Sequence, residues 1–283
     1  MFAEGLLRDA RILVTGGGSG LGKEIAAACA KLGATVYLCG RRQAVLEEAA
    51  AGMGGRAIPI VCDIKSGEAI EAMLDTIWAE GPLTGLVNNA AGNFIARTED
   101  LSIRGFDAIA DIVFKGTFQM TQACGKRWLA AGDKASVVSI LATWVWNGSP
   151  FAVPSAMSKA GVNVMTQSLA VEWGGRGIRL NSICPGPFQT EGASVRLNPT
   201  GDSRLGWNPM GRTGRPEELG NLAVFLLAPG AEFVNGQTIA IDGAAWQATG
   251  QNFSALTEWS GEQWAAAKAA APGIDARDKA ARA

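Results

Sequence analysis

A glycine-rich stretch near the N-terminus is the first candidate for chemistry. Residues 15–22 read TGGGSGLG and stand between an apolar run and a segment of helical period. Glycines permit a tight turn and a close approach of the backbone to a ligand, and the N–H groups at the start of a helix favour a phosphate. The stretch predicts a turn that binds the pyrophosphate of a dinucleotide; an ordinary surface loop is the alternative. The residues expected to contact the cofactor are Gly16, Gly18, Ser19, Gly20, Leu21 and Gly22.

Two arginines indicate which nicotinamide cofactor binds. An enzyme that uses NAD has an acidic residue after the second strand, on the ribose hydroxyls, whereas this chain has CGRR at 39–42. Arg41, helped by Arg42, is suited to pair with the 2′-phosphate of NADP(H). Alternatively, both arginines simply begin a solvated helix. Other expected cofactor contacts follow later strands: Asp63 at the adenine, and Asn89 and Ala90 on the ribose side.

The composition excludes several kinds of chemistry. The chain has no histidine and one tyrosine, Tyr37, which rules out Ser-His-Asp triads, Cys-His pairs and imidazole-ligated metals. Its five cysteines stand singly in apolar runs, without the spacing of a zinc site or a disulfide framework. We expect no metal and reduced, buried thiols.

Charge and hydropathy limit the partners. The formal net charge is −1, with acids and bases interspersed, so neither nucleic acid nor an anionic membrane is expected to bind. No apolar run approaches the roughly 20 residues of a membrane span, and the N-terminus has no basic-then-apolar signal region. We expect a cytoplasmic protein with a small-molecule substrate.

The elements that must position these residues follow from an alternation of short β-branched runs with segments of helical period. This pattern predicts an α/β, Rossmann-type doubly wound parallel sheet of about seven strands, with helices on both faces. The expected strands are 11–15, 35–39, 57–62, 85–88, 135–141, 178–183 and 238–242. The expected helices are 20–32, 43–52, 67–79, 107–131, 156–174 and 216–228.

The chain divides into one domain and a tail. Residues 1–245 are expected to form the NADP-binding domain. Within it, residues 185–215 are rich in Gly, Pro, Asn and Ser and longer than a plain connection, which predicts a substrate lid. Residues 246–283 predict a partly helical C-terminal tail.

Several further segments are distinctive. They are VNNAAGNF (87–94), DIVFKGTF (111–118), FAVPSAMSKAGV (151–162), PGPFQTEG (185–192), RLNPTG (196–201), EELGNLAVFL (217–226) and EQW (262–264). In these segments, and over residues 10–245 as a whole, the chain resembles the short-chain dehydrogenase/reductase superfamily. Within it, the closer resemblance is to the 2,4-dienoyl-CoA reductases, especially the mitochondrial type. The resemblance implies NADPH-dependent conversion of 2,4-dienoyl-CoA to 3-enoyl-CoA in fatty-acid β-oxidation, an acyl-CoA substrate and a homotetramer.

The catalytic set of the wider superfamily is largely missing. Its members use Asn, Ser, Tyr and Lys, with the tyrosine four residues before the lysine. Here the lysine is Lys159, Ser155 replaces the tyrosine, and the other two positions hold Val113 and Ala142. Reduction of an ordinary ketone needs the phenol as a proton donor, so we do not expect it.

Conjugate reduction has a lighter requirement, because charge spreads to the thioester oxygen and needs only hydrogen-bond donors. The resemblance assigns that role to Asn93, although an asparagine that only holds its loop is the alternative. In the mitochondrial enzymes a tyrosine stands fifteen residues before the lysine, and this chain has Trp144 there. An indole donates a hydrogen bond but is no acid near neutral pH. Trp144 therefore donates weakly, lines the acyl pocket beside Trp146, or only packs.

The resemblance also implies roles for other residues. Lys159 would hold the nicotinamide ribose, and Ser155 would bond the nicotinamide side or the thioester. Expected at the nicotinamide are Pro185, Gly186 and Phe188, and expected at the acyl-CoA are Lys65, Phe94, Ser102 and Arg196. Lys65 and Arg196 have the alternative of being solvated surface charges.

Two other functions stay open. The chain could reduce a different conjugated carbonyl compound, with TWVWNG at 143–148 reshaping the pocket. It could instead be a non-catalytic NADP-binding protein that lost its chemistry with the tyrosine. The presence of both Asn93 and Lys159 argues against that alternative.

Overall fold

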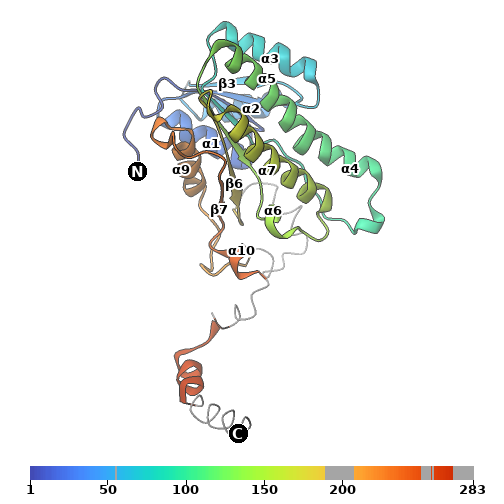
Figure 1. The fold of residues 1–283 in the computed structure, drawn as a ribbon, viewed down its shortest axis with the longest axis vertical. Coiled ribbons are helices and arrows are strands. Elements are labelled where there is room, and N and C mark those ends of the chain that lie inside the picture. The colour runs from blue at the N-terminus through green and yellow to red at the C-terminus, as the bar shows by residue number, and fades with distance from the viewer. Residues whose placement is uncertain (55, 189–206, 250–255, 257, 270–283) are drawn as a thin grey trace.

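A parallel sheet of seven strands forms the centre of the computed structural model, which describes residues 1–283 except 55, 189–206, 250–255, 257 and 270–283. The strand order is β3-β2-β1-β4-β5-β6-β7, and all neighbours run parallel. The strands are β1 (Arg11–Thr15), β2 (Thr35–Gly40), β3 (Ala57–Val61), β4 (Gly85–Asn88), β5 (Ala135–Ile140), β6 (Ile178–Pro185) and β7 (Thr238–Ile241). This is the predicted doubly wound sheet (Figure 1).

Helices cover both faces of the sheet (Figure 1). They are α1 (Gly20–Lys31), α2 (Gln43–Ala51), α3 (Gly67–Ala79), α4 (Ile103–Ala110), α5 (Thr117–Ala131), α6 (Trp144–Asn147), α7 (Val153–Gly174), α9 (Pro216–Leu227) and α10 (Ala245–Ala248). Short helical turns lie at η1 (Thr98–Asp100) and η3 (Pro229–Ala231), and η2 (Asp111–Gly116) is a π-helical segment. Residues 261–269 are also helical.

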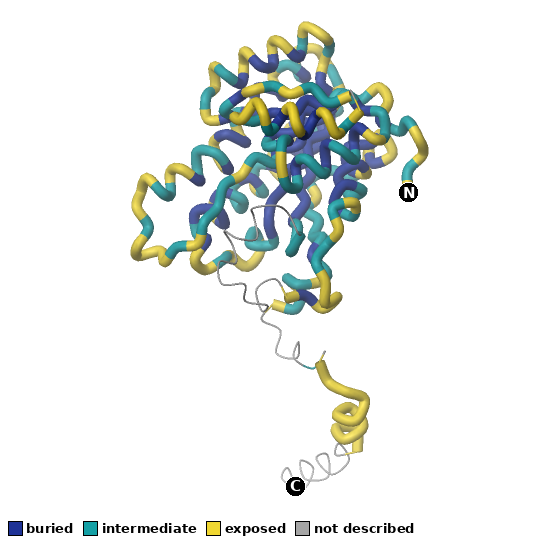
Figure 2. The backbone as a smooth tube through the Cα atoms, turned by 180° about the vertical axis from the view of Figure 1, so that it is seen from behind, coloured by how far each residue is buried: buried dark blue, intermediate teal, exposed yellow. Residues whose placement is uncertain are grey.

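Alternating side chains of the strands supply the two halves of the core. Along β1, Ile12 and Val14 face α1, α2 and α9, whereas Leu13 faces α3, α5 and α7. This follows from the two-residue period of a strand whose both faces are covered. Figure 2 shows the buried chain concentrated in the sheet, with exposed residues on the outer helices.

The switch in strand order places the site. The chain moves from β1 outward to β3, then returns to β4 beside β1 and continues to β7. Ligands of open α/β sheets bind where the order reverses, beyond the carboxyl ends of the strands. The turns that follow the strands therefore line the edge of the sheet where a ligand would bind.

Three of the predicted elements differ from the structure by two residues or more at one end. The single predicted helix 107–131 begins at Ile103 and contains η2 between α4 and α5. Helix α7 begins at Val153, before the predicted 156, because Pro154 fits the first turn of a helix, where no N–H is required. Strand β6 continues to Pro185 because β7 pairs with it there.

The cysteines lie in the core of the described chain. All five cysteines are buried and free of disulfides. Within the residues that the structure describes, no group of three or more His, Cys, Asp or Glu side chains is arranged to hold a metal. No helix in the same residues has both the length and the apolar character needed to cross a membrane.

Candidate active site

The glycine-rich turn joins β1 to α1 in a space that side chains cannot share. Gly16 has a φ of +66°, and a Cβ on it would lie 3.0 Å from the Ala90 Cα atom. A Cβ on Gly22 would lie 2.3 Å from the Asn89 Nδ2 atom and 2.5 Å from the Gly16 carbonyl oxygen. Ser19 is the N-cap of α1, yet its side chain makes no capping hydrogen bond. The turn therefore brings bare backbone and the start of a helix to the switch point of the sheet.

The end of β4 holds this turn in place. The Asn89 side-chain amide donates to the carbonyl oxygens of Thr15 at 3.0 Å and Gly16 at 3.3 Å. In return, the Thr15 hydroxyl accepts the backbone N–H groups of Asn89 and Ala90, each at 3.0 Å. Asn89 thus serves the shape of the turn, and its amide protons are engaged there.

The ends of β2 and β3 lie beside the turn. Arg41 and Arg42 follow β2 and are exposed, and neither guanidinium group makes a hydrogen bond or ion pair with any residue that the structure describes. The Asp63 carboxylate accepts the Lys65 backbone N–H at 3.1 Å, and its other oxygen lies 3.9 Å from the Lys65 Nζ atom. Two free guanidinium groups therefore flank the turn, whereas Lys65 is partly neutralised.

The loop after β4 carries Asn93. Its side-chain oxygen accepts the backbone N–H of Phe94 at 2.9 Å, so the amide NH2 group is directed elsewhere. That NH2 group donates to no residue in the described part of the chain. Further along the loop, the Ala96 N–H donates to the Phe151 carbonyl at 3.0 Å, which ties this loop to the segment before α7. Phe151 has a φ of +63°, an uncommon conformation for a bulky residue.

Helix α7 brings Ser155 and Lys159 into the crevice. They are one turn apart, so they lie on the same face of the helix. The Lys159 Nζ atom donates to the Leu141 carbonyl at 2.7 Å, and desolvation lowers the pKa of its amine to about 8. The Ser155 side chain is 1% exposed, and its hydroxyl has no hydrogen-bond partner among the described residues. A buried, unpaired hydroxyl beside a half-buried cation needs a polar ligand.

Trp144 and Trp146 lie on α6, directly after β5. Trp144 is half-buried, and its indole N–H donates to no group in the described chain. Trp146 stacks on Trp246 of α10, with ring centroids 4.7 Å apart and planes at 25°. The segment between β5 and α7 is therefore an aromatic wall at the carboxyl end of the sheet.

The segment after β6 packs closely on the end of β7. A Cβ on Gly186 would lie 2.6 Å from the Asp242 Cα atom, and the Gly186 N–H donates to the Ile241 carbonyl at 3.0 Å. The Phe188 ring covers Gly214, whose added Cβ would lie 2.4 Å from it. Both glycines are thus required by close packing.

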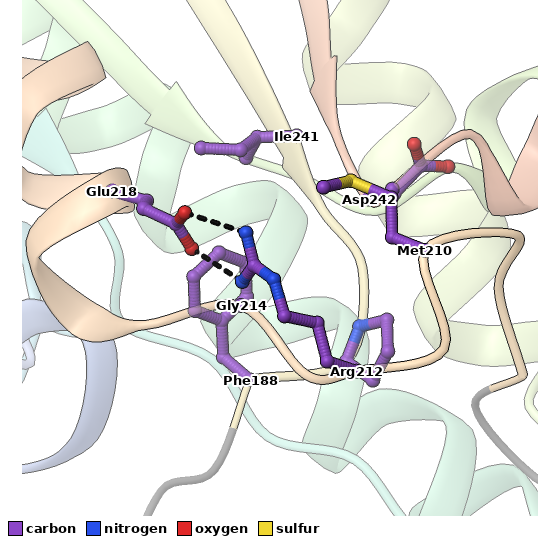
Figure 3. A pocket seen from close by; sticks show the side chains of 9 residues that line it. Phe188, Met210, Arg212, Gly214, Glu218, Ile241 and Asp242 are labelled. Carbon is purple, nitrogen blue, oxygen red and sulfur yellow. Dashed lines mark hydrogen bonds and ion pairs between the residues drawn. The ribbon is translucent and has the colours of Figure 1, made fainter.

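A pocket of about 190 Å³ lies between the segments after β6 and β7 and the start of α9 (Figure 3). Inside it, the Arg212 guanidinium donates two hydrogen bonds to the Glu218 carboxylate, at 2.8 and 2.9 Å. This pairing neutralises the arginine, and the other lining side chains are mainly apolar. The pocket contains none of the predicted catalytic residues. Its lining residues are Pro187, Phe188, Met210, Arg212, Gly214, Glu218, Ile241, Asp242 and Gly243.

The predicted acyl-CoA contacts have mixed placements. Ser102 is the N-cap of α4, and its hydroxyl accepts the Gly105 N–H at 3.1 Å, which gives it a structural role. Phe94 is half-buried and adjoins Gly105. Arg196, like most of the predicted lid, lies outside the described residues.

Comparison with known proteins identifies the family. A family profile described as Enoyl-(Acyl carrier protein) reductase matches residues 16–244. A probable 2,4-dienoyl-CoA reductase from Caenorhabditis elegans, named as (3E)-enoyl-CoA-producing, is 40% identical over 98% of this chain and 94% of that protein. A probable 2,4-dienoyl-CoA reductase from Bacillus subtilis, named as (2E)-enoyl-CoA-producing, is 38% identical over 83% of this chain and 96% of that protein. The crystal structure of a short-chain dehydrogenase from Bacillus anthracis has a TM-score of 0.77 at 38% identity, over 84% of this chain and 97% of that one.

The chain belongs to the short-chain dehydrogenase/reductase family. Its resemblance to the 2,4-dienoyl-CoA reductases within that family is confirmed by the relatives of that name. Membership makes it an oxidoreductase with a nicotinamide cofactor. The bare backbone at Gly16 and Gly22, the open start of α1 and the unpaired Ser155 hydroxyl all fit such a cofactor.

Some residues of this dehydrogenase/reductase site were not found from the sequence. Thr15 holds the end of β4 through its hydroxyl, Phe151 anchors the Asn93 loop, and Trp246 completes the aromatic wall. The position of Thr15 directly before the glycines was a usable signal. The other two depend on contacts between distant segments and leave no local pattern.

Proposed function

We propose that this chain reduces 2,4-dienoyl-CoA to 3-enoyl-CoA with NADPH. The observation that carries the proposal is the Asn93 amide: its oxygen accepts the Phe94 N–H, while its NH2 group has no acceptor among the described residues. The relatives named as 2,4-dienoyl-CoA reductases support the substrate class, and the two free arginines after β2 support NADPH over NADH.

The reaction needs little from the protein beyond fixed donors. When bound, NADPH supplies a hydride that adds to the far carbon of the diene. Asn93 donates to the thioester oxygen as negative charge accumulates there, which lowers the barrier by stabilising the enolate. The α-carbon then takes a proton from water, because the chain has no phenol near this site: Tyr37, the single tyrosine, is buried in the core.

Ser155 and Lys159 complete the site. The Lys159 ammonium holds the nicotinamide ribose hydroxyls and adds positive charge near the developing enolate. The Ser155 hydroxyl, with no protein partner in the described chain, bonds the nicotinamide side or the thioester. Trp144 lines the acyl site or donates weakly through its indole. Pro185 and Gly186 bracket the nicotinamide.

A spectrophotometric assay tests the proposal. Purified protein, NADPH and a medium-chain 2,4-dienoyl-CoA are mixed, and the absorbances of the nicotinamide and of the dienoyl group are followed together. We expect both to fall at equal molar rates, and chromatography of the product to give 3-enoyl-CoA. Formation of 2-enoyl-CoA instead would mean that the protein is a 2,4-dienoyl-CoA reductase with the other product regiochemistry. Loss of neither absorbance would leave a non-catalytic NADP-binding protein, while activity on other conjugated carbonyl compounds alone would favour a different reductase.

Lys159 gives the site a pH dependence. Its folded pKa of about 8 lies below the ordinary value of 10.5, so the amine is mostly charged at pH 7 and loses that charge as the pH rises through 8. We expect the dissociation constant for NADPH to rise above pH 8, by up to tenfold per pH unit. Fluorescence titration between pH 6.5 and 9.5 measures it. The neighbouring Cys184 thiol stays protonated there, because burial raises its pKa to about 12.

The matched control for this titration is Lys159→Met, which keeps the length of the side chain and removes the charge. Its NADPH affinity should be weaker at pH 7 and flat across the same range. An unchanged rise above pH 8 in this variant would assign the titration to another group.

We propose a homotetramer that assembles through an apolar face on η2, α4, α5 and α7. Phe114 packs against Gly161 and remains 48% exposed. Val164→Glu on this face should lower the assembled mass measured by light scattering, because burying the carboxylate is costly. Val61→Glu, on a similarly exposed valine at the end of β3, should leave the mass unchanged. Other exposed apolar residues of the face are Ile103, Phe118, Met157 and Val171.

The cytoplasmic location stays a prediction.

A further inference from the structure

Two tryptophans from distant parts of the chain meet at the carboxyl end of the sheet. Trp146 follows β5 on α6, and Trp246 follows β7 on α10. Their rings stack with centroids 4.7 Å apart. Strand β6 lies between β5 and β7, so the stacked pair spans the end of β6, where Pro185 and Gly186 leave the strand.

The backbone fixes Trp246 in place. The buried Asp242 carboxylate accepts hydrogen bonds from the backbone N–H groups of Trp246 at 2.8 Å and of Ala244 at 3.0 Å. Ala244 has a φ of +66°, a left-handed conformation that persists only where the surrounding structure enforces it. Asp242 itself packs against Gly186. Trp246 is therefore a fixed support for its partner ring.

Trp146 keeps an open surface. Although it stacks on Trp246, 38% of it is exposed, and α6 packs against α7, which carries Ser155 and Lys159. A large, fixed aromatic ring contributes a wide apolar contact at little cost in conformational entropy. Trp146 thus offers an apolar surface beside the helix that carries Ser155 and Lys159.

The spacing of the strands sets a distance. Asn93 lies in the loop that begins at the end of β4, and the order β4-β5-β6 places two strand intervals between the end of β4 and the position of the stacked pair. Neighbouring strands are about 4.8 Å apart, so the pair lies about 10 Å along the sheet edge from the end of β4. Carbon–carbon single bonds are about 1.5 Å long, so an extended acyl chain of roughly eight carbons covers that length.

We propose that the Trp146–Trp246 pair is the end wall of the acyl site and limits the acyl group to medium length. This rests on the proposed function, because it places the thioester at Asn93. From there the bulky, charged CoA moiety stays toward solvent, and the acyl chain runs past Ser155 until it meets the paired rings. The pair therefore determines the specificity of the reductase for chain length.

Chain-length kinetics test the wall. The ratio of kcat/KM for a 16-carbon to that for an eight-carbon 2,4-dienoyl-CoA is measured in the wild type and in Trp146→Ala and Trp246→Ala. We expect the ratio to rise at least tenfold in both variants, through a lower KM for the long substrate. Trp246→Phe, which keeps a ring to stack, should stay within threefold of the wild type.

Phe233→Ala is the matched control. Phe233 is a fully exposed aromatic residue that precedes the amino end of β7, away from the crevice, and its removal should leave the ratio unchanged. Thermal melting monitors folding in every variant. A ratio that stays within twofold of the wild type in both alanine variants, or an equal loss with both substrates, would overturn the proposal.

Direct binding separates this proposal from the proposed function. Calorimetric titration of saturated acyl-CoAs from eight to 16 carbons into the NADP-loaded protein gives the affinity as a function of chain length. If no dienoyl-CoA is reduced but the alanine variants extend the binding to longer chains, the proposed end wall is supported and the proposed reaction is contradicted. If no acyl-CoA of any length binds, both the proposed end wall and the proposed function are contradicted.

Discussion

Asn93→Asp is expected to lower kcat for a 2,4-dienoyl-CoA by roughly a hundredfold or more, since removal of one oxyanion donor typically costs about 3 kcal/mol. The carboxylate still accepts the Phe94 N–H, as the native side-chain oxygen does. It donates nothing, however, and its negative charge opposes the developing enolate. Steady-state kinetics at several substrate concentrations separate this loss in kcat from any change in KM.

The aspartate variant distinguishes the two roles considered for Asn93. If the side chain only holds its loop, Asp keeps that hydrogen bond and retains activity, whereas Asn93→Ala loses it. If the amide is the donor, both variants lose kcat to a similar or greater extent, with Asp the worse of the two. Wild-type activity in Asn93→Asp would refute the role of the amide in catalysis.

Arg41→Ala is expected to raise the KM for NADPH by about ten- to a hundredfold and to leave the KM for NADH nearly unchanged. A guanidinium that pairs with a phosphate contributes roughly 1.5–3 kcal/mol, and exposure to solvent reduces this value. Arg41 makes no ion pair with the described residues, so its removal breaks no contact of the protein with itself. Parallel assays with both cofactors measure the shift in preference.

Two further variants sharpen the test of Arg41. Arg42→Ala in addition should deepen the preference for NADH, because the neighbouring guanidinium partly replaces the first. Arg176→Ala removes an exposed arginine that follows α7 and precedes β6, at the opposite end of the sheet, and should change neither KM. An equal rise in KM for both cofactors in Arg41→Ala would mean that Arg41 does not recognise the 2′-phosphate.

The alternation of apolar strands and periodic helices was enough to predict the sheet. The bounds of β1, β4 and α3 agree with the predicted ranges, because each is a continuous run with clear ends. Helix α6 was not predicted, since four residues are too few to show a helical period. The π-helical segment η2 was missed for the same reason, because its six residues are too few to show a period that differs from that of the α-helices on either side.

The residues of the candidate site also fall into two groups: those that a local sequence pattern reveals, and those that only contacts between distant segments reveal. The glycine turn and the two arginines have local patterns with direct physical meaning, and the structure places them around one end of the sheet. Asn89 has a role that composition alone does not reveal, because its amide satisfies the carbonyl groups of the turn. Backbone carbonyls in a tight turn need such donors. The stacking of Trp146 on Trp246 joins residues about a hundred positions apart, beyond the reach of any sequence period.

The crowding at Gly22 has a consequence for how this chain can vary. A β-carbon there would collide with the Asn89 amide, and a smaller residue at 89 relieves only that clash. The Gly16 carbonyl oxygen, 2.5 Å from the same β-carbon, belongs to the main chain and stays where it is. Compensatory exchange between positions 22 and 89 alone is therefore not enough to admit a side chain at position 22, because the clash with the main chain remains.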